Sequence, residues 1–137
     1  MNIRLDKFTI AFSRFALFLV YFWFGSLKIL ETSPASEMVL GLLDKTIPFM
    51  NKELFLIMFG SFEVLIGLLF LIPRLDKLSL ILLGFHLSTA MLPLFLMSQF
   101  TWSNFLVPTL EGQYILKNVL IISAGLNIMA NLRKIKS

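Results

Sequence analysis

The sequence has no cysteine, a single histidine and few charged residues. Without cysteine there are no disulfides, thiolate metal sites or thiol redox motifs. One histidine is too little to build a metal centre, so no metal is expected. Only 15% of the 137 residues are charged and 58% are hydrophobic, with a mean hydropathy of +0.87. One small soluble domain cannot bury that much apolar surface, so we predict a single membrane domain over residues 1–137.

Recognised catalytic and nucleic-acid-binding patterns are also missing. The sequence contains no phosphate loop and no HExxH, and Ser26 and Ser61 have no histidine at a plausible triad position. The isoelectric point is 9.6, but the basic residues sit at the ends of apolar runs rather than on one polar face. We therefore expect no nucleic-acid partner and lean away from an enzyme, although the residues alone do not decide that question.

Four apolar runs have the length needed to cross a membrane. About twenty helical residues at about 1.5 Å each span a hydrocarbon core of about 30 Å. The runs cover residues 8–30, 52–72, 78–98 and 112–132. They predict an all-α integral membrane protein, an antiparallel four-helix bundle.

The connection between the first two runs contains a shorter amphipathic pattern. Ser33 is a candidate N-cap, Pro34 suits the first helical position, and Pro48 ends the pattern. An apolar stripe is formed by Met38, Val39, Leu42 and Leu43. This helix is too short to span, so we expect it along the membrane surface or over the mouth of the bundle.

The distribution of basic residues predicts the orientation of the chain, because Lys and Arg are in excess on cytoplasmic flanks. One side has eight basic residues: Arg4, Lys7, Arg14, Arg74, Lys77, Arg133, Lys134 and Lys136. The other side has four: Lys28, Lys45, Lys52 and Lys117. Both termini are therefore predicted to be cytoplasmic.

Glu63 lies near the middle of the second run, where a carboxylate needs a partner or a hydrated cavity. Counting from the cytoplasmic ends puts Arg14, Glu63 and His86 at nearly the same depth. These residues, with others of similar depth or helical phase, form a predicted inner polar layer of Glu63, Arg14, His86, Tyr21, Ser123 and Asn127. We predict that Arg14 pairs with Glu63, either as a structural ion pair or as part of a ligand or proton site. For His86, a hydrogen-bonded core role is favoured over metal binding.

A second polar layer is predicted near the opposite membrane face, where charges are partly hydrated. Its members are Lys28, Glu53, Glu111, Gln113 and Lys117. Small residues on the stripes beside the polar ones allow close helix packing, and we assign this role to Gly25, Gly60 and Gly67.

Three segments of the chain read RFALFLVYFWFGSLKIL, GSFEVLIGLLFLIPR and PTLEGQYILKNVLIISAGL. They resemble the DoxX-like family of small bacterial membrane proteins, including its reactive-chlorine-resistance branch. The matching positions are an arginine opening the first span, then Trp23, Gly25 and Lys28, then Gly60, Glu63, Val64, Ile66 and Gly67, then Gly112, Lys117 and Asn118. The resemblance implies a four-helix bundle in the bacterial cytoplasmic membrane, associated with quinone-dependent or oxidative-stress systems.

Three functions remain open at this point. The first is a non-catalytic component that binds a lipid or a quinone-like molecule, or supports a partner membrane redox complex, with Glu63, Arg14 and His86 as its inner pocket. The second is a small proton-coupled transporter or pore that uses Glu63. The third is a membrane oxidoreductase subunit that handles quinone directly. Quinone or lipid is the candidate cofactor, the lipid bilayer is the expected surrounding partner, and a homo-oligomer is compatible with all three.

Overall fold

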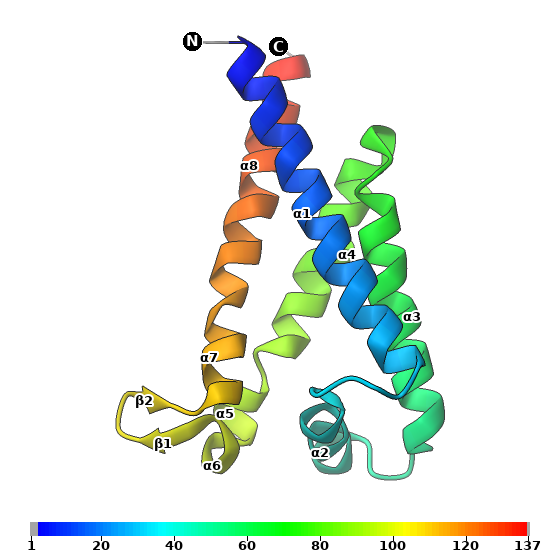
Figure 1. The fold of residues 1–137 in the computed structure, drawn as a ribbon, viewed down its shortest axis with the longest axis vertical. Helices are drawn as coiled ribbons and strands as arrows, with labels where there is room; N and C mark the ends of the chain where they lie inside the picture. The colour runs from blue at the N-terminus through cyan, green and yellow to red at the C-terminus, as the bar shows by residue number, and fades with distance from the viewer. Residues whose placement is uncertain (1–2, 137) are drawn as a thin grey trace.

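The computed structural model describes residues 3–136, which are mostly helical (Figure 1). The first half contains α1 (Ile3–Ile29), α2 (Ser36–Thr46), α3 (Lys52–Leu69), the 3-10 turn η1 (Pro73–Leu75) and α4 (Asp76–Ala90). The second half contains α5 (Pro93–Leu96), α6 (Ser98–Thr101), the strands β1 (Trp102–Asn104) and β2 (Val107–Pro108), α7 (Leu110–Leu116) and α8 (Asn118–Lys136).

Three helical segments in the described part of the chain are long and apolar enough to cross a membrane. They are Arg4–Ile29, Pro73–Leu96 and Leu110–Leu132. The predicted second span corresponds to α3, whose 18 residues include Lys52, Glu53 and Glu63. α3 is itself strongly apolar; the three charges within those 18 residues set it apart from the other three segments, among which it packs.

The closest helix pair is α1 with α3, and glycines form their contact. A Cβ atom added to Gly60 would lie 2.6 Å from the carbonyl oxygen of Gly25, and one added to Gly67 would lie 2.9 Å from the backbone nitrogen of Phe22. At these positions only hydrogen fits between the backbones. The predicted close-packing role of Gly25, Gly60 and Gly67 is therefore confirmed.

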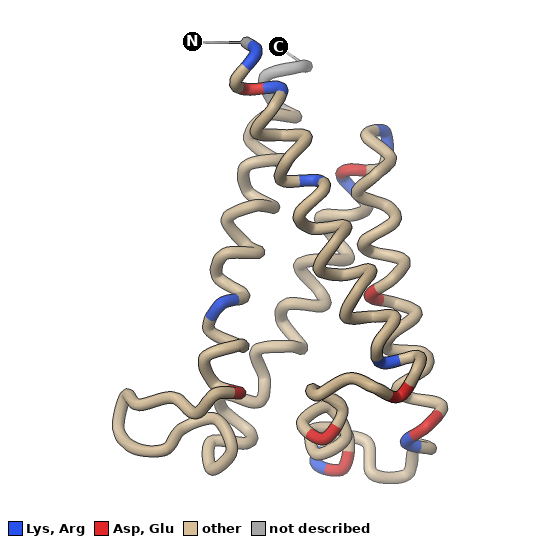
Figure 2. The backbone as a smooth tube through the Cα atoms, viewed as in Figure 1, with Lys and Arg blue, Asp and Glu red and all other residues tan. Residues whose placement is uncertain are grey.

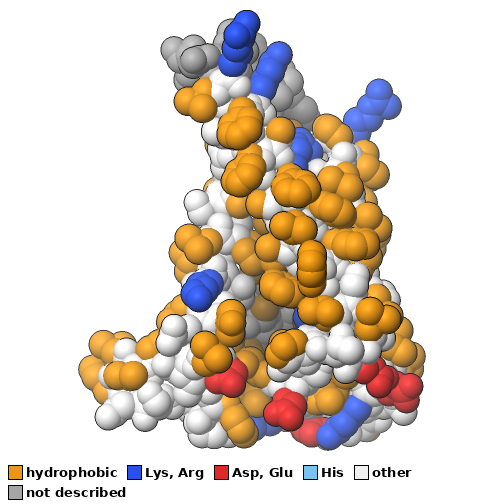
Figure 3. Space-filling view, in the orientation of Figure 1, with side chains coloured by type: hydrophobic (Ala, Val, Ile, Leu, Met, Phe, Trp, Pro, Cys, Tyr) orange, Lys and Arg blue, Asp and Glu red, His pale blue; other side chains and the backbone are white. Residues whose placement is uncertain are grey.

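The other long helices complete the arrangement around this pair. α4 contacts α3, and α8 contacts both α1 and α4. The start of α1 and the end of α8 lie together at one end of the molecule (Figure 1). The buried core contains Leu17, Tyr21, Ile66, Phe70, Leu83, Leu87 and Ile128. Most phenylalanines of α1 are exposed instead, and hydrophobic side chains cover much of the face in Figure 3.

The last two predicted spans are interrupted. Pro93 has no N–H to donate, and its ring crowds the preceding turn, so α4 ends at Ala90 and α5 begins at Pro93. In the last span, the N–H of Leu120 donates to the carbonyl of Lys117, three residues back, which makes a tight turn between α7 and α8.

The predicted amphipathic helix is present as α2, but its start differs from the prediction. α2 begins at Ser36, and its N-cap, Ala35, makes no side-chain capping bond. The hydroxyl of Ser33 instead accepts a hydrogen bond from the N–H of Ala35 in the preceding turn. Ser33 therefore stabilises the entry turn rather than the helix end, and Pro34 lies before the helix.

Candidate functional site

The polar centre of the molecule is a hydrogen-bonded chain across three helices, which we call the buried quartet: Tyr21, Lys28, Glu63 and His86. The Nζ of Lys28 donates to Oε2 of Glu63 over 2.7 Å. Nε2 of His86 lies 2.9 Å from Oε1 of Glu63, and Nδ1 lies 2.9 Å from the hydroxyl of Tyr21. All four residues are buried.

The antiparallel packing of α1 and α3 explains why Lys28 reaches Glu63. Lys28 packs beside Gly60, one turn from Glu63 along α3. Side chains on a helix tilt toward its own N-terminus, so in an antiparallel pair Lys28 and Glu63 tilt toward each other. Gly25 permits this approach, because a Cβ added there would lie 2.9 Å from the Cβ of Glu63.

Aromatic rings enclose the quartet. The His86 ring packs edge-on to Tyr21, with centroids 5.1 Å apart, and against Phe59 at 5.2 Å and Phe62 at 6.3 Å. The ammonium of Lys28 lies 5.8 Å from the centre of the Phe59 ring. Such rings exclude water, and the face of Phe59 attracts the cation.

The hydrogen bonds of the quartet are mutually consistent when Glu63 is ionised and His86 is neutral. A carboxylate can only accept, so Nε2–H of His86 donates to Glu63 and its Nδ1 accepts from the Tyr21 hydroxyl. Lys28 supplies the balancing positive charge. The quartet is then electrically neutral and each bond has one donor and one acceptor, which lowers the cost of placing it in apolar surroundings.

The predicted pair of Glu63 with Arg14 is wrong. The guanidinium of Arg14 makes two bonds with the carboxylate of Asp76, the first residue of α4, and one with the carbonyl of Phe70. Asp76 is buried, with its side chain 2% exposed. Asp76 was not identified as a partner from the sequence, because residues 73–77 fall between two predicted spans. An acid between the basic residues Arg74 and Lys77 is the feature that could have indicated it.

An error in depth explains the wrong pair. The prediction placed residue 8 level with Ile72, but Arg14 lies level with Phe70, so more of α1 extends past the end of α3 than expected. Glu63 is seven residues away from Phe70 along α3, which at about 1.5 Å per residue is about 10 Å. The prediction that His86 and Glu63 share a level is confirmed by their hydrogen bond.

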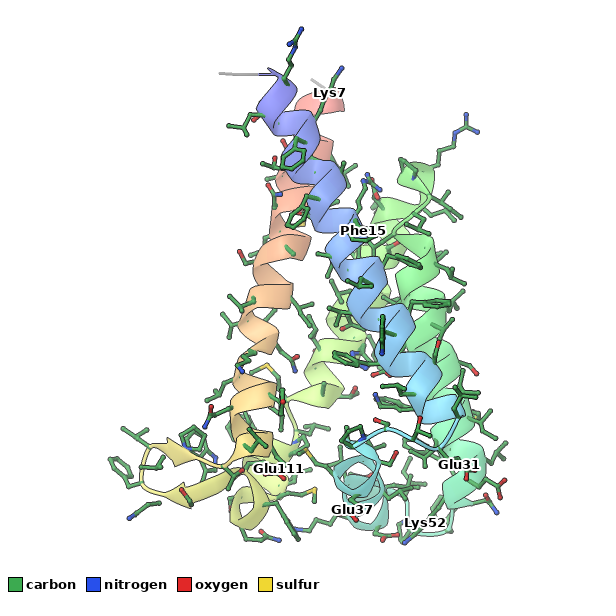
Figure 4. All side chains as sticks on the ribbon, viewed as in Figure 1. Lys7, Phe15, Glu31, Glu37, Lys52 and Glu111 are labelled. Carbon is green, nitrogen blue, oxygen red and sulfur yellow. The ribbon has the colours of Figure 1, made fainter. Side chains whose placement is uncertain are left out.

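The predicted outer layer does not form around Lys28. Lys28 is buried in the quartet, so its assignment to a hydrated layer is wrong. The other four members, Glu53, Glu111, Gln113 and Lys117, are exposed at their own positions. Lys117 lies over the ring of Tyr114 at 5.1 Å. Glu111 does lie at the end of the molecule that carries Glu31 and Glu37, as Figure 4 shows.

The two predicted inner-layer residues of α8 lie outside the quartet. Asn127 donates to the hydroxyl of Ser13 on α1 and accepts from the side chain of Asn131, so it links α8 to α1. Ser123 is exposed. Asn127 therefore contributes to helix association, and the partners described for Glu63 are Lys28 and His86 instead.

No metal-binding group of three His, Asp or Glu side chains gathers within residues that the structure describes. Two surface hollows are present, and neither is lined by the quartet. One, of about 170 Å³, lies between α4 and α8; the other, of about 320 Å³, is lined by residues of α6 and the β1–β2 hairpin. Within the quartet, the Tyr21 hydroxyl and the His86 ring are the groups that could give up their mutual hydrogen bond for one to another molecule.

Geometry and composition define the class as a mostly helical protein in which three described segments are long and apolar enough to span a membrane. Comparisons with protein-family models, curated proteins and solved structures found no match. The resemblance to the DoxX-like family therefore stays a prediction.

Proposed function

We propose that this protein is a non-catalytic integral component of the bacterial cytoplasmic membrane. Its long helices form a four-helix bundle, and its polar centre binds the headgroup of a lipid or a quinone-like molecule. Through that molecule it supports a partner membrane redox complex, as the family resemblance implies. The buried quartet takes the place of the pocket of Glu63, Arg14 and His86 expected from the sequence.

The observation that carries this proposal is that hydrogen-bonding groups, which could bond to a ligand instead of to each other, lie beside aromatic rings. The Tyr21 hydroxyl bonds to the His86 ring, which packs against Phe59 and Phe62. A flat carbonyl-bearing ring suits such a setting, because it stacks on aromatic faces and accepts a hydrogen bond from a hydroxyl that rotates. Binding then exchanges the Tyr21–His86 bond for a bond to the ligand.

Native mass spectrometry in mild detergent tests the proposal, and the two tyrosines of the chain provide a matched pair. The wild-type protein is expected to carry a bound lipid or quinone-sized mass. Tyr21→Phe should lose it, whereas Tyr114→Phe should keep it, because Tyr114 is exposed. A mass that persists in both variants, or its absence from the wild type, would contradict binding at the quartet.

A proton-coupled transporter is the second candidate, and one observation favours it. Tyr21, His86, Glu63 and Lys28 form a continuous chain of groups that can pass protons. In that case, proteoliposomes would show proton-driven solute flux that collapses in Glu63→Gln. Flux of this kind would replace the non-catalytic binding function.

A further inference from the structure

The segment between α5 and α7 has no role in the quartet and carries an unusual surface. It contains α6 and the β1–β2 hairpin, in which Trp102 pairs with Pro108 and Asn104 with Val107. No charged residue occurs from residue 91 to residue 110. The hairpin projects sideways from the helices at the end that also carries α2 (Figure 1).

Many apolar side chains of this segment and of the helices that flank it are exposed, whereas Met97 is buried. Phe105 at the hairpin tip is 87% exposed, and Leu106 beside it is 74% exposed. Phe95, Phe100, Val107 and Leu110 are exposed as well. Contiguous apolar surface of this kind marks a site of contact with a membrane or another protein.

Several polar groups of the same segment bond to nearby backbone, although Ser98, Gln99, Ser103 and Asn104 are themselves exposed. The Ser103 hydroxyl donates to the carbonyl of Val107, and the Thr109 hydroxyl donates to that of Phe100. The indole N–H of Trp102 donates to the carbonyl of Leu94, and Asn104 accepts from the N–H of Phe105. Internal satisfaction of this kind is what a lipid environment requires, because lipid offers no hydrogen-bonding partners.

The position of the segment in the chain fixes its depth. It joins the end of one membrane-length segment, Pro73–Leu96, to the start of another, Leu110–Leu132. Its exposed side chains therefore continue the apolar surface of those helices at the membrane boundary. The connection that contains α2 lies at the same end but carries exposed charges, including Glu37 and Asp44, as Figure 2 shows for the acidic residues of that end.

We propose that the β1–β2 hairpin is a lateral anchor that inserts Phe105 and Leu106 into the boundary between lipid headgroups and acyl chains. The hairpin surface contacts the lipid bilayer, whereas the neighbouring α2 remains in contact with water. Tryptophan favours this boundary region, and the segment supplies Trp102 beside the exposed apolar rings of Phe100 and Phe105. The anchor acts independently of ligand binding at the quartet.

Site-directed spin labelling tests the anchor, and the cysteine-free sequence makes single-cysteine variants unambiguous. Phe105→Cys is compared with Glu37→Cys on α2, both labelled and reconstituted in phosphatidylcholine vesicles. Collisions with oxygen, which concentrates in lipid, are expected to exceed those with a water-soluble nickel chelate at residue 105. The order is expected to reverse at residue 37. Val107→Cys provides a second hairpin position if the first variant folds poorly.

Two results would overturn the anchor. Greater accessibility to the nickel chelate at residues 105 and 107 would place the hairpin in water. Low accessibility to both reagents, together with spin–spin broadening between labelled copies, would place it in an interface with a second copy of this chain.

Discussion

Glu63 accepts hydrogen bonds from two helices at once, and its pairing with Lys28 makes a specific prediction. Removing either charge leaves the other buried and uncompensated, so Glu63→Gln and Lys28→Met should each lower the free energy of unfolding by about 3 to 5 kcal/mol. The double variant should be milder than the two single losses added together. Thermal or denaturant unfolding in detergent measures the difference.

The exposed pair of Lys52 and Asp44 provides the control for that cycle. Their side chains are 55% and 48% exposed, so Lys52→Gln should cost less than about 1 kcal/mol. Strictly additive losses at Lys28 and Glu63 would contradict the pairing.

Arg14 has a different partner, and a second cycle distinguishes the two possibilities. Arg14→Gln and Asp76→Asn should be strongly coupled, because the two side chains share two hydrogen bonds. Arg14→Gln and Glu63→Gln should be nearly additive, because sites about 10 Å apart with no shared partner behave independently. Unfolding of the singles and doubles in one detergent measures both couplings. Coupling between Arg14 and Glu63 would restore the pair expected from the sequence.

The sequence reveals which polar residues lie within the apolar spans, but it does not reveal which of them bond to each other. Glu63, His86 and Tyr21 stand out as polar groups within apolar runs, and the structure brings them together. Lys28 was assigned to the membrane boundary because a lysine near a helix end can extend to water. Its side chain instead points back along α1, and that choice depends on the packing of α3 against Gly25.

The α1–α3 contact makes a prediction at the scale of whole elements. Gly60→Ala places a Cβ against the backbone of Gly25, and neither backbone can yield without separating the helices. We expect a loss of about 1 to 3 kcal/mol, the usual cost of overpacking. The measurement is the unfolding midpoint in detergent.

Gly84 on α4 is the matched control for this change. No atom lies within 4 Å of a Cβ added there, so Gly84→Ala should be neutral or raise stability by up to about 1 kcal/mol, because alanine favours the helix. An equal loss in both variants would show that the contact is not tight.

Element types were largely predictable, whereas breaks within the elements were not. Apolar runs of spanning length identified all four long helical regions, and Pro48 follows the end of α2 as predicted, whereas Pro34 lies before the helix and not at its first position. The apolar runs 78–98 and 112–132 continue past Pro93 and Lys117, so run length alone does not reveal the ends of α4 and α7. The β1–β2 hairpin was missed because its two strands are only three and two residues long, too short to show alternation.

Charge at the two ends of the molecule predicts its orientation. The end with Lys7 is basic, and the end with Glu31, Glu37 and Glu111 is mainly acidic (Figure 4). Because basic flanks stay in the cytoplasm, reporters fused before residue 1 and after residue 137 should both be active there. A reporter inserted at Asp44 should be active only if it is of a kind that works on the side opposite the cytoplasm. The prediction also counts Arg133, Lys134 and Lys136, whose side chains the structure does not describe. Activity of the two terminal fusions on opposite sides would contradict the orientation.

The close α1–α3 pair also bears on how the protein enters the membrane during synthesis. α3 carries three charges, and Glu63 lies near its centre; a charged residue at a helix centre opposes insertion by about 2.5 to 3.5 kcal/mol. Lys28 is translated before Glu63, so α1 already presents the neutralising charge when α3 reaches the translocon. α1 then serves as an insertion partner for α3. In chains stalled after Ile72, Lys28→Met should lower the fraction of α3 that inserts, as measured by glycosylation mapping, and Lys7→Met should leave it unchanged.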